Sequence, residues 1–109
     1  MTPPWTVTVV QPAKNDILGA VRYILDTLDN PPAAHRLLDD LESAILSLSS
    51  HPARFRPLPV SPWRERNYHG LSVRRFLIVY RIDTETRTVH VARVFHTRQD
   101  WHALLNNLP

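Results

Sequence analysis

The sequence predicts an α+β protein with the element order β-α-α-β-β-β, an antiparallel sheet, a helical hairpin on one face of that sheet and a short C-terminal helix. Three observations lead to this prediction. Apolar residues recur at helical spacing across residues 13–48, they form strand-like runs across residues 73–95, and a proline-rich stretch lies between. The chain has 109 residues, 43% of them hydrophobic, which fits a single domain spanning 1–109. The other face of the sheet, or one end of it, is then open for function.

The first strand and the first helix follow from local pattern. Residues 5–10, WTVTVV, are rich in β-branched side chains and partly alternate, which is typical of a strand. Pro12 ends that strand, and from Ala13 apolar residues recur at i, i+3, i+4 and i+7 as far as Leu28. Gly19 inside this pattern costs helix stability and indicates close packing.

The second helix begins after the DNPP stretch at residues 29–32, because proline suits the first turn of a helix. Its apolar positions share one face of the helix: Ala34, Leu37, Leu38, Leu41, Ala44, Ile45 and Leu48. Two amphipathic helices joined by a tight, proline-containing link predict a helical hairpin.

The second half of the chain is predicted as a loop followed by three strands. Four prolines within residues 52–63 favour an extended loop. The strands that follow are a polar edge strand at 64–69, ended by a turn at Gly70, an apolar central strand at 73–82, and a last strand at 88–95 after a hairpin turn at 83–87. In the last strand, Val89, Val91, Arg93 and Phe95 share one face and His90, Ala92, Val94 and His96 the other, unless a β-bulge shifts the register.

The C-terminal helix is predicted from a capping signal. Thr97 and Asp100 have the spacing of a capping box, with Thr97 at the N-cap and Asp100 at the third helical position. Asp100 is therefore interpreted as a cap and not as a catalytic acid. Trp101 begins an apolar face with Leu104 and Leu105, and we expect it to anchor the core.

Charge is distributed unevenly along the chain. The first fifty residues hold six carboxylates and three cationic residues, whereas residues 51–109 hold four carboxylates and ten arginines. Twelve of the thirteen cationic residues are Arg, whose planar guanidinium binds phosphate or carboxylate through two hydrogen bonds. The basic half indicates either an anionic partner or a solvated surface, and both interpretations remain open at this point.

Several classes of function are excluded. Without cysteine there is no disulfide, thiol nucleophile or cysteine zinc site, and His90, His96 and His102 do not converge on a metal in strand or helix geometry. No glycine-rich phosphate loop is present, so we expect neither a metal nor a small-molecule cofactor. The longest apolar run, FLIVY at 76–80, is too short to span a bilayer, and no signal peptide is visible. We expect a cytoplasmic protein without a membrane partner.

Four stretches together carry a family resemblance. They are YILDTLDNPPAA at 23–34, LSLSSHPARFRPLP at 46–59, RRFLIVYRID at 74–83 and RVFHTRQDW at 93–101. Their order and spacing, from about Val7 to Leu105, resemble toxins of the RelE/ParE superfamily from bacterial type II toxin–antitoxin modules. The resemblance implies a compact fold with a twisted antiparallel sheet, growth inhibition, and neutralisation by a cognate antitoxin. We expect an acidic, apolar antitoxin segment to cover the basic sheet.

The superfamily has more than one activity. RelE-like and YoeB-like members cleave mRNA on the ribosome, whereas ParE-like members poison DNA gyrase and are not nucleases. Metal-free RNA cleavage needs a base, an acid and cationic donors for the phosphorane. The first hypothesis is accordingly a ribosome-dependent mRNA endonuclease, the second a ParE-like gyrase poison without nuclease activity, and the third a non-toxic interaction partner.

The nuclease hypothesis assigns roles to seven residues. The resemblance places His96 where YoeB-like toxins carry a histidine, as acid or base, and Arg66 on a strand where the nucleases carry a phosphate-binding arginine. Arg93 completes the candidate catalytic group. The candidate RNA- and phosphate-binding residues are Arg75, Arg81, Arg98 and His69.

Three features favour the gyrase hypothesis instead. The lysine-rich site of RelE-like nucleases is missing, because no Lys follows Lys14. His96 is followed by Thr97 and a further helix, unlike the short ending of YoeB-like toxins. The RVFHTRQDW ending also resembles ParE-like sequences, in which Arg93 is held by a helix carboxylate and His96 has a structural role.

Overall fold

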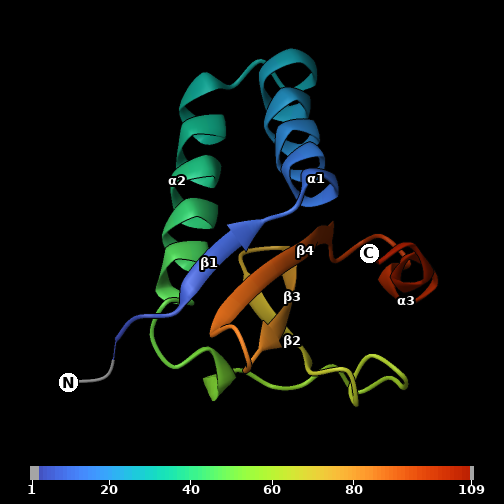
Figure 1. Ribbon diagram of the computed structural model, residues 1–109. Helices are drawn as coiled ribbons and strands as arrows, with labels where there is room; N and C mark the ends of the chain where they lie inside the picture. Colours follow the sequence, from blue (N-terminus) through green and yellow to red (C-terminus); the bar gives the residue numbers. More distant parts are fainter. Residues whose placement is uncertain (1–2, 109) are drawn as a thin grey trace.

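The computed structural model describes residues 3–108 and contains a four-stranded sheet with a helical hairpin on one face (Figure 1). The elements, in chain order, are β1 (Thr6–Val9), α1 (Gln11–Arg22), a π-helical turn (Tyr23–Thr27), α2 (Pro31–Ser47), a 3₁₀ turn (Pro52–Arg54), β2 (Tyr68–Val73), β3 (Phe76–Asp83), β4 (Thr88–His96), α3 (Trp101–Leu104) and a final 3₁₀ turn (Leu105–Asn107). The predicted α+β class and element order are confirmed. Among the described residues, no helix is both long and apolar enough to cross a membrane.

The sheet has the strand order β1-β4-β3-β2 and is mixed. β2, β3 and β4 form the predicted antiparallel meander, whereas β1 pairs in parallel with the first half of β4, from Thr6 opposite Thr88 to Val9 opposite Val91. The prediction of an antiparallel sheet is thus corrected for β1. Side-chain alternation predicts a strand but not the direction of its partner strand, because side chains alternate with a period of two in parallel and antiparallel sheets alike.

The helical hairpin is confirmed, with shifted ends. α1 begins at Gln11, so Pro12 lies in its first turn, where a missing N–H costs nothing, and does not merely end the strand. α2 begins as predicted at the proline pair, and the side chain of Asn30 caps it by accepting from the N–H of Ala33 at 3.2 Å. The π-helical turn between them was not predicted.

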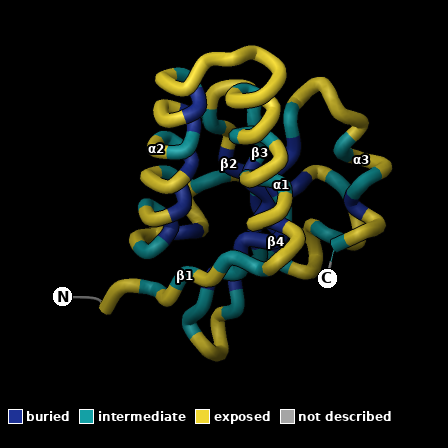
Figure 2. The backbone as a smooth tube through the Cα atoms, turned by 90° about the horizontal axis from the view of Figure 1, so that it is seen from above, coloured by how far each residue is buried: buried dark blue, intermediate teal, exposed yellow. Residues whose placement is uncertain are grey.

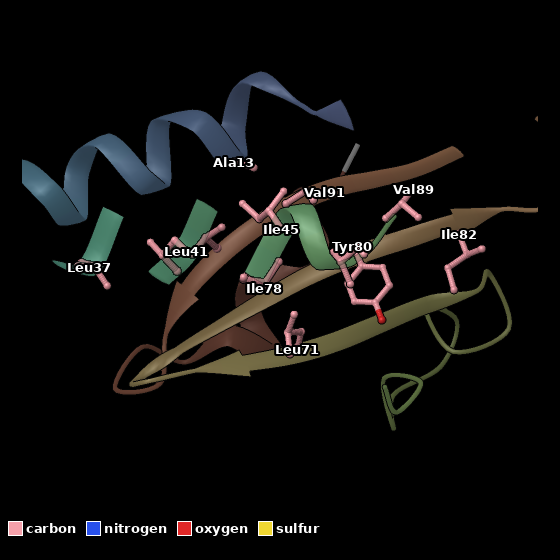
Figure 3. Packing of buried hydrophobic residues seen from close by; sticks show 12 residues of the cluster. Ala13, Leu37, Leu41, Ile45, Leu71, Ile78, Tyr80, Ile82, Val89 and Val91 are labelled. Atoms are coloured by element: carbon pink, nitrogen blue, oxygen red, sulfur yellow. The ribbon is translucent and has the colours of Figure 1, made fainter. Parts of the chain in front are cut away.

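The main core lies between the helical hairpin and the sheet (Figure 3). Leu41 and Ile45 of α2 pack over Ile78 and Tyr80 of β3, and each of these side chains is at most 7% exposed. Buried residues recur every three or four positions along α2, as its amphipathic pattern requires, and the resulting buried stripe faces the sheet (Figure 2). This core fixes the position of the hairpin on the sheet.

The second face of the sheet is also covered. Leu58 from the proline-rich loop and Leu105 at the C-terminus pack on Val79, Ala92 and Phe95. Trp101 packs against the same cluster, which confirms its predicted role as an anchor. The chain itself therefore covers the middle of this face, which is one of the two regions that the sequence analysis expected to be open.

The strand boundaries differ from the prediction at β2. Residues 64–67 form a turn and not an edge strand, and β2 begins at Tyr68. Gly70 lies inside β2, where a Cβ would come within 3.0 Å of the Leu77 side chain, so it provides room for the neighbouring strand and does not make a turn. The reversal between β2 and β3 occurs at Arg74, which has a φ of 53°.

A β-bulge in β4 changes the predicted faces of the last strand. Val79 pairs with Arg93 and Tyr80 with Val91, which leaves Ala92 as the extra residue. Beyond the bulge the predicted faces exchange, so that Val94 joins Val91 in the main core and Phe95 joins the second cluster. This outcome is the alternative that the sequence left open.

The C-terminal helix begins later than the capping box predicted. Residues 97–100 form a turn, and Asp100 is itself the N-cap of α3, accepting from the N–H of Ala103 at 3.4 Å. Asp100 is thus a cap, as interpreted, but at a different helical position.

Candidate functional site

A groove lies between the helical hairpin and the end of the sheet, where Figure 1 shows the hairpin projecting beyond the strands. We call it the hairpin groove. Its volume is about 650 Å³. The groove is lined by Asn15, Asp16, Gly19, Ala20, Tyr23, Ile24 and Leu28 of the first helical segment, Ala33 and Leu37 of α2, and Arg74, Arg75, Phe76, Val94, His96 and Gln99 at the end of the sheet. Most of its lining is apolar, with polar groups gathered on the sheet side.

The polar side of the groove contains two of the predicted site residues, His96 and Arg75, and a third, Arg98, lies next to His96. His96 ends β4, with its ring edge-on to Phe76 and its Nδ1 accepting from the backbone N–H of Arg98 at 3.0 Å. Arg75 lies in the adjacent β2–β3 turn, and its carbonyl accepts from the N–H of Thr97 at 2.8 Å. His96, Arg75 and Arg98 therefore share one corner of the molecule. The hydrogen bond from Arg98 leaves Nε2 as the protonated nitrogen of a neutral His96 ring.

Arg93 is held by a carboxylate from the helical hairpin. Its Nε and one Nη donate to Asp16 in α1 at 2.7 and 2.9 Å, and the N–H of Val94 donates to the same carboxylate at 2.9 Å. The hydrogen bonds that Arg93 donates to Asp16, together with the negative charge of that carboxylate, raise the pKa of the Arg93 guanidinium, while partial burial opposes this rise. Both side chains are 17% exposed. Asp16 thus joins α1 to the free edge of β4 just past the end of β1.

Two further arginines connect segments that are distant in the sequence. Arg74 pairs through its Nε with Asp40 of α2, and Arg87 donates to the carbonyl of Pro3 at 2.6 Å while its guanidinium lies over Trp5, 4.7 Å from the ring centre. Both arginines have a positive φ, which costs free energy for a side chain with a Cβ. Their side-chain contacts offset this cost and account for Arg at turn positions that glycine or asparagine usually occupies.

The remaining predicted site residues lie at the opposite end of the sheet. Arg66 is in the turn before β2, where its guanidinium lies 5.4 Å from the centre of the Trp63 ring, so the prediction that it lies on a strand is wrong. Arg81 faces Tyr68 and His90 across the sheet. The structure does not bring either arginine to His96, which pairs with Phe76 at the far end of β3.

His69 is buried, with 5% of its surface exposed. Its Nδ1 lies 2.9 Å from the carbonyl oxygen of Phe55 and its Nε2 3.2 Å from Oδ1 of Asn67, and its ring stacks on Tyr80. Both ring nitrogens therefore face oxygen atoms of the protein. This arrangement holds the loop after α2 against β2 and presents no ring nitrogen to a phosphate.

The sequence analysis did not identify the residues that form the apolar side of the groove. Tyr23 and Leu28 are 57% and 56% exposed, although helical spacing alone predicts that Leu28 faces the core. The sequence held no signal for this offset, because the first helical segment and the two long strands β3 and β4 have similar lengths, about 25 to 30 Å. Within residues 3–108, no group of three metal-ligating side chains is present.

This combination of fold and surface defines a class of protein: a RelE/ParE-like toxin domain, with a mixed sheet, a projecting helical hairpin and an arginine-rich sheet end. Comparison of the sequence with known families is more specific. Residues 7–101 match the family described as ParE toxin of type II toxin–antitoxin system, parDE, and the chain belongs to this family. No curated protein matches the chain at a significant level.

Solved structures support the same fold. The chain is similar to a protein of the chromosomal ParDE toxin–antitoxin system from P. aeruginosa, with a TM-score of 0.71 and 14% identity over 86% of this chain and 97% of that one. It is also similar to a chain of the RelBE2 toxin–antitoxin complex from Mycobacterium tuberculosis, with a TM-score of 0.62 and 26% identity over 85% and 98%. The isolated E. coli RelE toxin gives a TM-score of 0.50 and 17% identity over 94% and 96%.

Proposed function

We propose that this ParE-family toxin inhibits growth by binding DNA gyrase and does not cleave RNA itself. The target follows from the resemblance to ParE-like toxins, and one observation carries the choice against a nuclease. The residues that the nuclease hypothesis requires at one phosphate, His96, Arg66 and Arg93, do not converge. The sequence analysis gave the nuclease as the first hypothesis and the gyrase poison as the second, and this proposal reverses that order.

The separation of these residues is large compared with the reach of a side chain. His96 lies opposite Phe76, whereas the turn that carries Arg66 contacts β3 through the hydrogen bond from Ile82 N–H to the carbonyl of Asn67. The six residue steps of β3 from Phe76 to Ile82 span roughly 20 Å. General acid catalysis requires donor and reacting atom within about 3 Å. One scissile phosphate therefore cannot contact both Arg66 and His96 in this arrangement.

Arg93 supports the same choice. Its guanidinium already makes two hydrogen bonds to Asp16 and is mostly buried. Moving it to a phosphate would leave the Asp16 carboxylate with a single hydrogen bond and an uncompensated charge.

The direct test is a supercoiling assay with purified DNA gyrase, relaxed plasmid and increasing amounts of the toxin. We expect loss of supercoiling and accumulation of cleaved plasmid, and intact messenger RNA when the same preparation is added to cell-free translation. Full supercoiling activity in the presence of excess toxin contradicts the gyrase proposal.

The nuclease remains a second candidate because of the corner formed by His96, Arg75 and Arg98. In this version His96 is the acid or base and the two arginines bind the phosphate, without Arg66. Primer extension across a defined message, with and without ribosomes, distinguishes the two candidates. Discrete ribosome-dependent cuts that disappear in His96→Ala and Arg75→Ala favour the nuclease.

We further propose that a cognate antitoxin neutralises the toxin, as the family description and the toxin–antitoxin complex of RelBE2 suggest. The ten arginines of the second half make an acidic partner favourable. Co-expression with the protein encoded beside this toxin tests the proposal: growth is restored and the two proteins co-purify. Continued growth arrest in the presence of that protein contradicts it.

A further inference from the structure

One residue from each strand lies in a single row across the sheet, at the end away from the hairpin groove. Thr8 of β1 is opposite His90 of β4, and His90 is opposite Arg81 of β3. Arg81 is in turn opposite Tyr68 of β2. Neighbouring strands lie about 4.8 Å apart, so the row is roughly 14 Å wide.

The side chains of this row point to the second face of the sheet. The residues on either side of Thr8, His90 and Arg81 along their strands all pack in the main core, so these three side chains point away from it. Tyr68 belongs to the second core cluster and is buried, whereas Thr8 is exposed and His90 and Arg81 are half-buried. The covering of the second face therefore ends at this row.

The two basic side chains of the row have no anionic partner within residues 3–108. Arg81 makes no side-chain hydrogen bond or ion pair there. Nδ1 of His90 lies 3.0 Å from the hydroxyl oxygen of Thr8, and its Nε2 has no hydrogen bond in the same part of the chain. The carboxylate of Asp83, on the same face of β3, accepts from two backbone N–H groups of the β3–β4 turn at 3.1 and 3.2 Å. A guanidinium and an imidazole on adjacent strands are thus free to donate to one phosphate.

The loop before β2 extends this surface with further cations. Residues 54–66 hold four arginines and one carboxylate. The guanidinium of Arg66 lies over Trp63, whose ring packs edge-on against the tyrosine of the row with ring centres 5.9 Å apart. Arg56 and Arg64 are exposed, and their side chains have no hydrogen bond or ion pair with the described residues. We call the surface formed by the row and these arginines the cationic band: Thr8, His90, Arg81, Arg66, Arg64 and Arg56.

The loop that carries these arginines is held along the edge of β2, at the end of the sheet away from the projecting hairpin (Figure 1). The N–H of Leu58 donates to the carbonyl of Tyr68 at 2.9 Å. Two more backbone hydrogen bonds, both of 3.1 Å, join Gly70 to the carbonyl of Arg56 and Tyr68 to that of Trp63. Because the backbone is fixed in this way, less conformational entropy is lost when the arginines bind a partner.

The distribution of apolar side chains favours a nucleic acid over a protein as the partner of this band. Among the described residues, the large hydrophobic side chains that are exposed all lie on the helical hairpin: Leu18, Tyr23, Leu25, Leu28 and Leu46. None belongs to the cationic band. Protein–DNA interfaces are more polar and more positively charged than protein–protein interfaces, and arginine matches phosphate through two parallel hydrogen bonds.

The aromatic rings of the band indicate a duplex and not a single strand. Proteins that bind single strands stack the bases on open aromatic faces. Here Tyr68 is 3% exposed, and Trp63 is covered by the Arg66 guanidinium on its face. The band therefore offers donors for phosphates but no open ring for a base.

We propose that the cationic band binds the sugar–phosphate backbone of double-stranded DNA, so that the toxin contacts gyrase and the DNA held by gyrase together. This inference rests on the proposed gyrase target and adds DNA as a second ligand of the toxin. Contacts with the backbone carry no direct information about base sequence, so binding has no sequence preference. The band lies at the opposite end of the sheet from His96, and DNA binding there is independent of the nuclease candidate.

The first test measures binding of the purified toxin to a fluorescein-labelled DNA duplex of about 30 base pairs by fluorescence anisotropy. We expect a dissociation constant on the order of micromolar at about 50 mM salt. The double variant Arg66→Gln/Arg81→Gln should bind at least tenfold more weakly, and its slope of log affinity against log salt should be smaller by about two. Its melting temperature should stay close to that of the wild type, because neither side chain makes a hydrogen bond or ion pair within the described chain.

The matched control is Arg22→Gln/Arg36→Gln, which removes the same charge from two exposed positions on the helical hairpin. Its duplex affinity should stay within about twofold of the wild type, since electrostatic contacts with phosphate are local at this salt concentration. A loss equal to that of the Arg66→Gln/Arg81→Gln variant would mean that net charge alone governs binding, which overturns the assignment to the band. Tighter binding of a single strand or of RNA than of the DNA duplex overturns duplex DNA as the ligand.

The gyrase assay separates this inference from the proposed function. The Arg66→Gln/Arg81→Gln variant should bind gyrase without DNA as the wild type does, but should require at least tenfold more toxin for the same amount of cleaved plasmid. Equal duplex affinity and equal plasmid cleavage for this variant and the wild type overturn the inference and leave gyrase as the target. A wild-type toxin that binds the duplex through the band but neither binds nor inhibits gyrase overturns the proposed function instead.

Discussion

The two halves of the helical hairpin have the same amphipathic sequence pattern but different surroundings. In the half that lies over the sheet, Ala13, Leu41 and Ile45 are at most 7% exposed. In the half that projects past the sheet, Tyr23 and Leu28 are more than half exposed. The difference shows that an apolar stripe on a helix predicts a surface that tends to be buried. The chain itself buries this surface only where the sheet lies beneath the hairpin.

The sharpest way to test this comparison is to remove one leucine from each half. Leu41→Ala should lower the free energy of unfolding by about 2–5 kcal/mol, because Leu41 is fully buried and its removal leaves a cavity. Leu28→Ala should change it by less than about 0.5 kcal/mol, because its side chain is already largely solvated. Urea denaturation of both variants gives these values. Equal losses would mean that the projecting half is also packed in solution.

The boundary between the two halves is held by Asp16. Asp16→Ala should cost about 2–3 kcal/mol of stability, because it removes three hydrogen bonds and leaves Arg93 partly buried without a counter-charge. Arg93→Ala should lower the free energy of unfolding less than Asp16→Ala does, because Asp16 keeps its hydrogen bond from the Val94 N–H. Thermal unfolding of the two single variants and the double variant measures the coupling. Additive losses would show that the pair contributes no interaction of its own.

How far the sequence predicted this molecule depends on which residues are considered. Hydrophobic periodicity predicted the hairpin, β3 and β4 because each buries a continuous stripe. The parallel pairing of β1 and the bulge at Ala92 were not predictable, because both depend on which strands meet. A carboxylate partner for Arg93 was foreseen as an alternative and is confirmed with Asp16.

The candidate site was predicted less well than the fold. His96 and Arg75 were identified by residue type, and the structure brings them to one groove. Arg66 and His69 were chosen by the same criterion, but one lies in a turn at the other end and the other is buried. Residue type describes what a side chain is able to bind, whereas the distance between side chains depends on strand register. The predicted catalytic roles stay predictions.

Tyr80 of β3 lies in the core beneath the half of the hairpin that covers the sheet, and it makes the stability of this core dependent on pH. Its hydroxyl donates to the carbonyl of Pro52 at 2.5 Å, and burial raises its pKa from 10 to about 12. The unfolded chain therefore loses the phenolic proton first as pH rises above 10. The stability due to the neutral phenol is fully present below pH 10 and declines by up to about 2 kcal/mol as pH approaches 12. Unfolding free energies measured at several alkaline pH values check this decline.

The control for this decline is a second tyrosine. Tyr80→Phe should remove this part of the alkaline loss, at the cost of about 1 kcal/mol at neutral pH for the lost hydrogen bond. Tyr23→Phe should leave the alkaline profile unchanged, because Tyr23 belongs to the exposed half of the hairpin. An identical alkaline profile for Tyr80→Phe and the wild type would contradict the assignment to Tyr80.

The smallest expected effect has the opposite sign and lies in the projecting half. Gly19→Ala should raise the free energy of unfolding of the isolated toxin by about 1 kcal/mol, since the new methyl group meets nothing and alanine restricts the unfolded chain more than glycine does. Thermal denaturation of the toxin alone, beside Ala20→Gly as the reverse change at the neighbouring position, measures it. A toxin destabilised by Gly19→Ala would mean that another part of the chain packs against Gly19 in solution. A stabilised toxin would mean that the fold of the free toxin does not require glycine at this position.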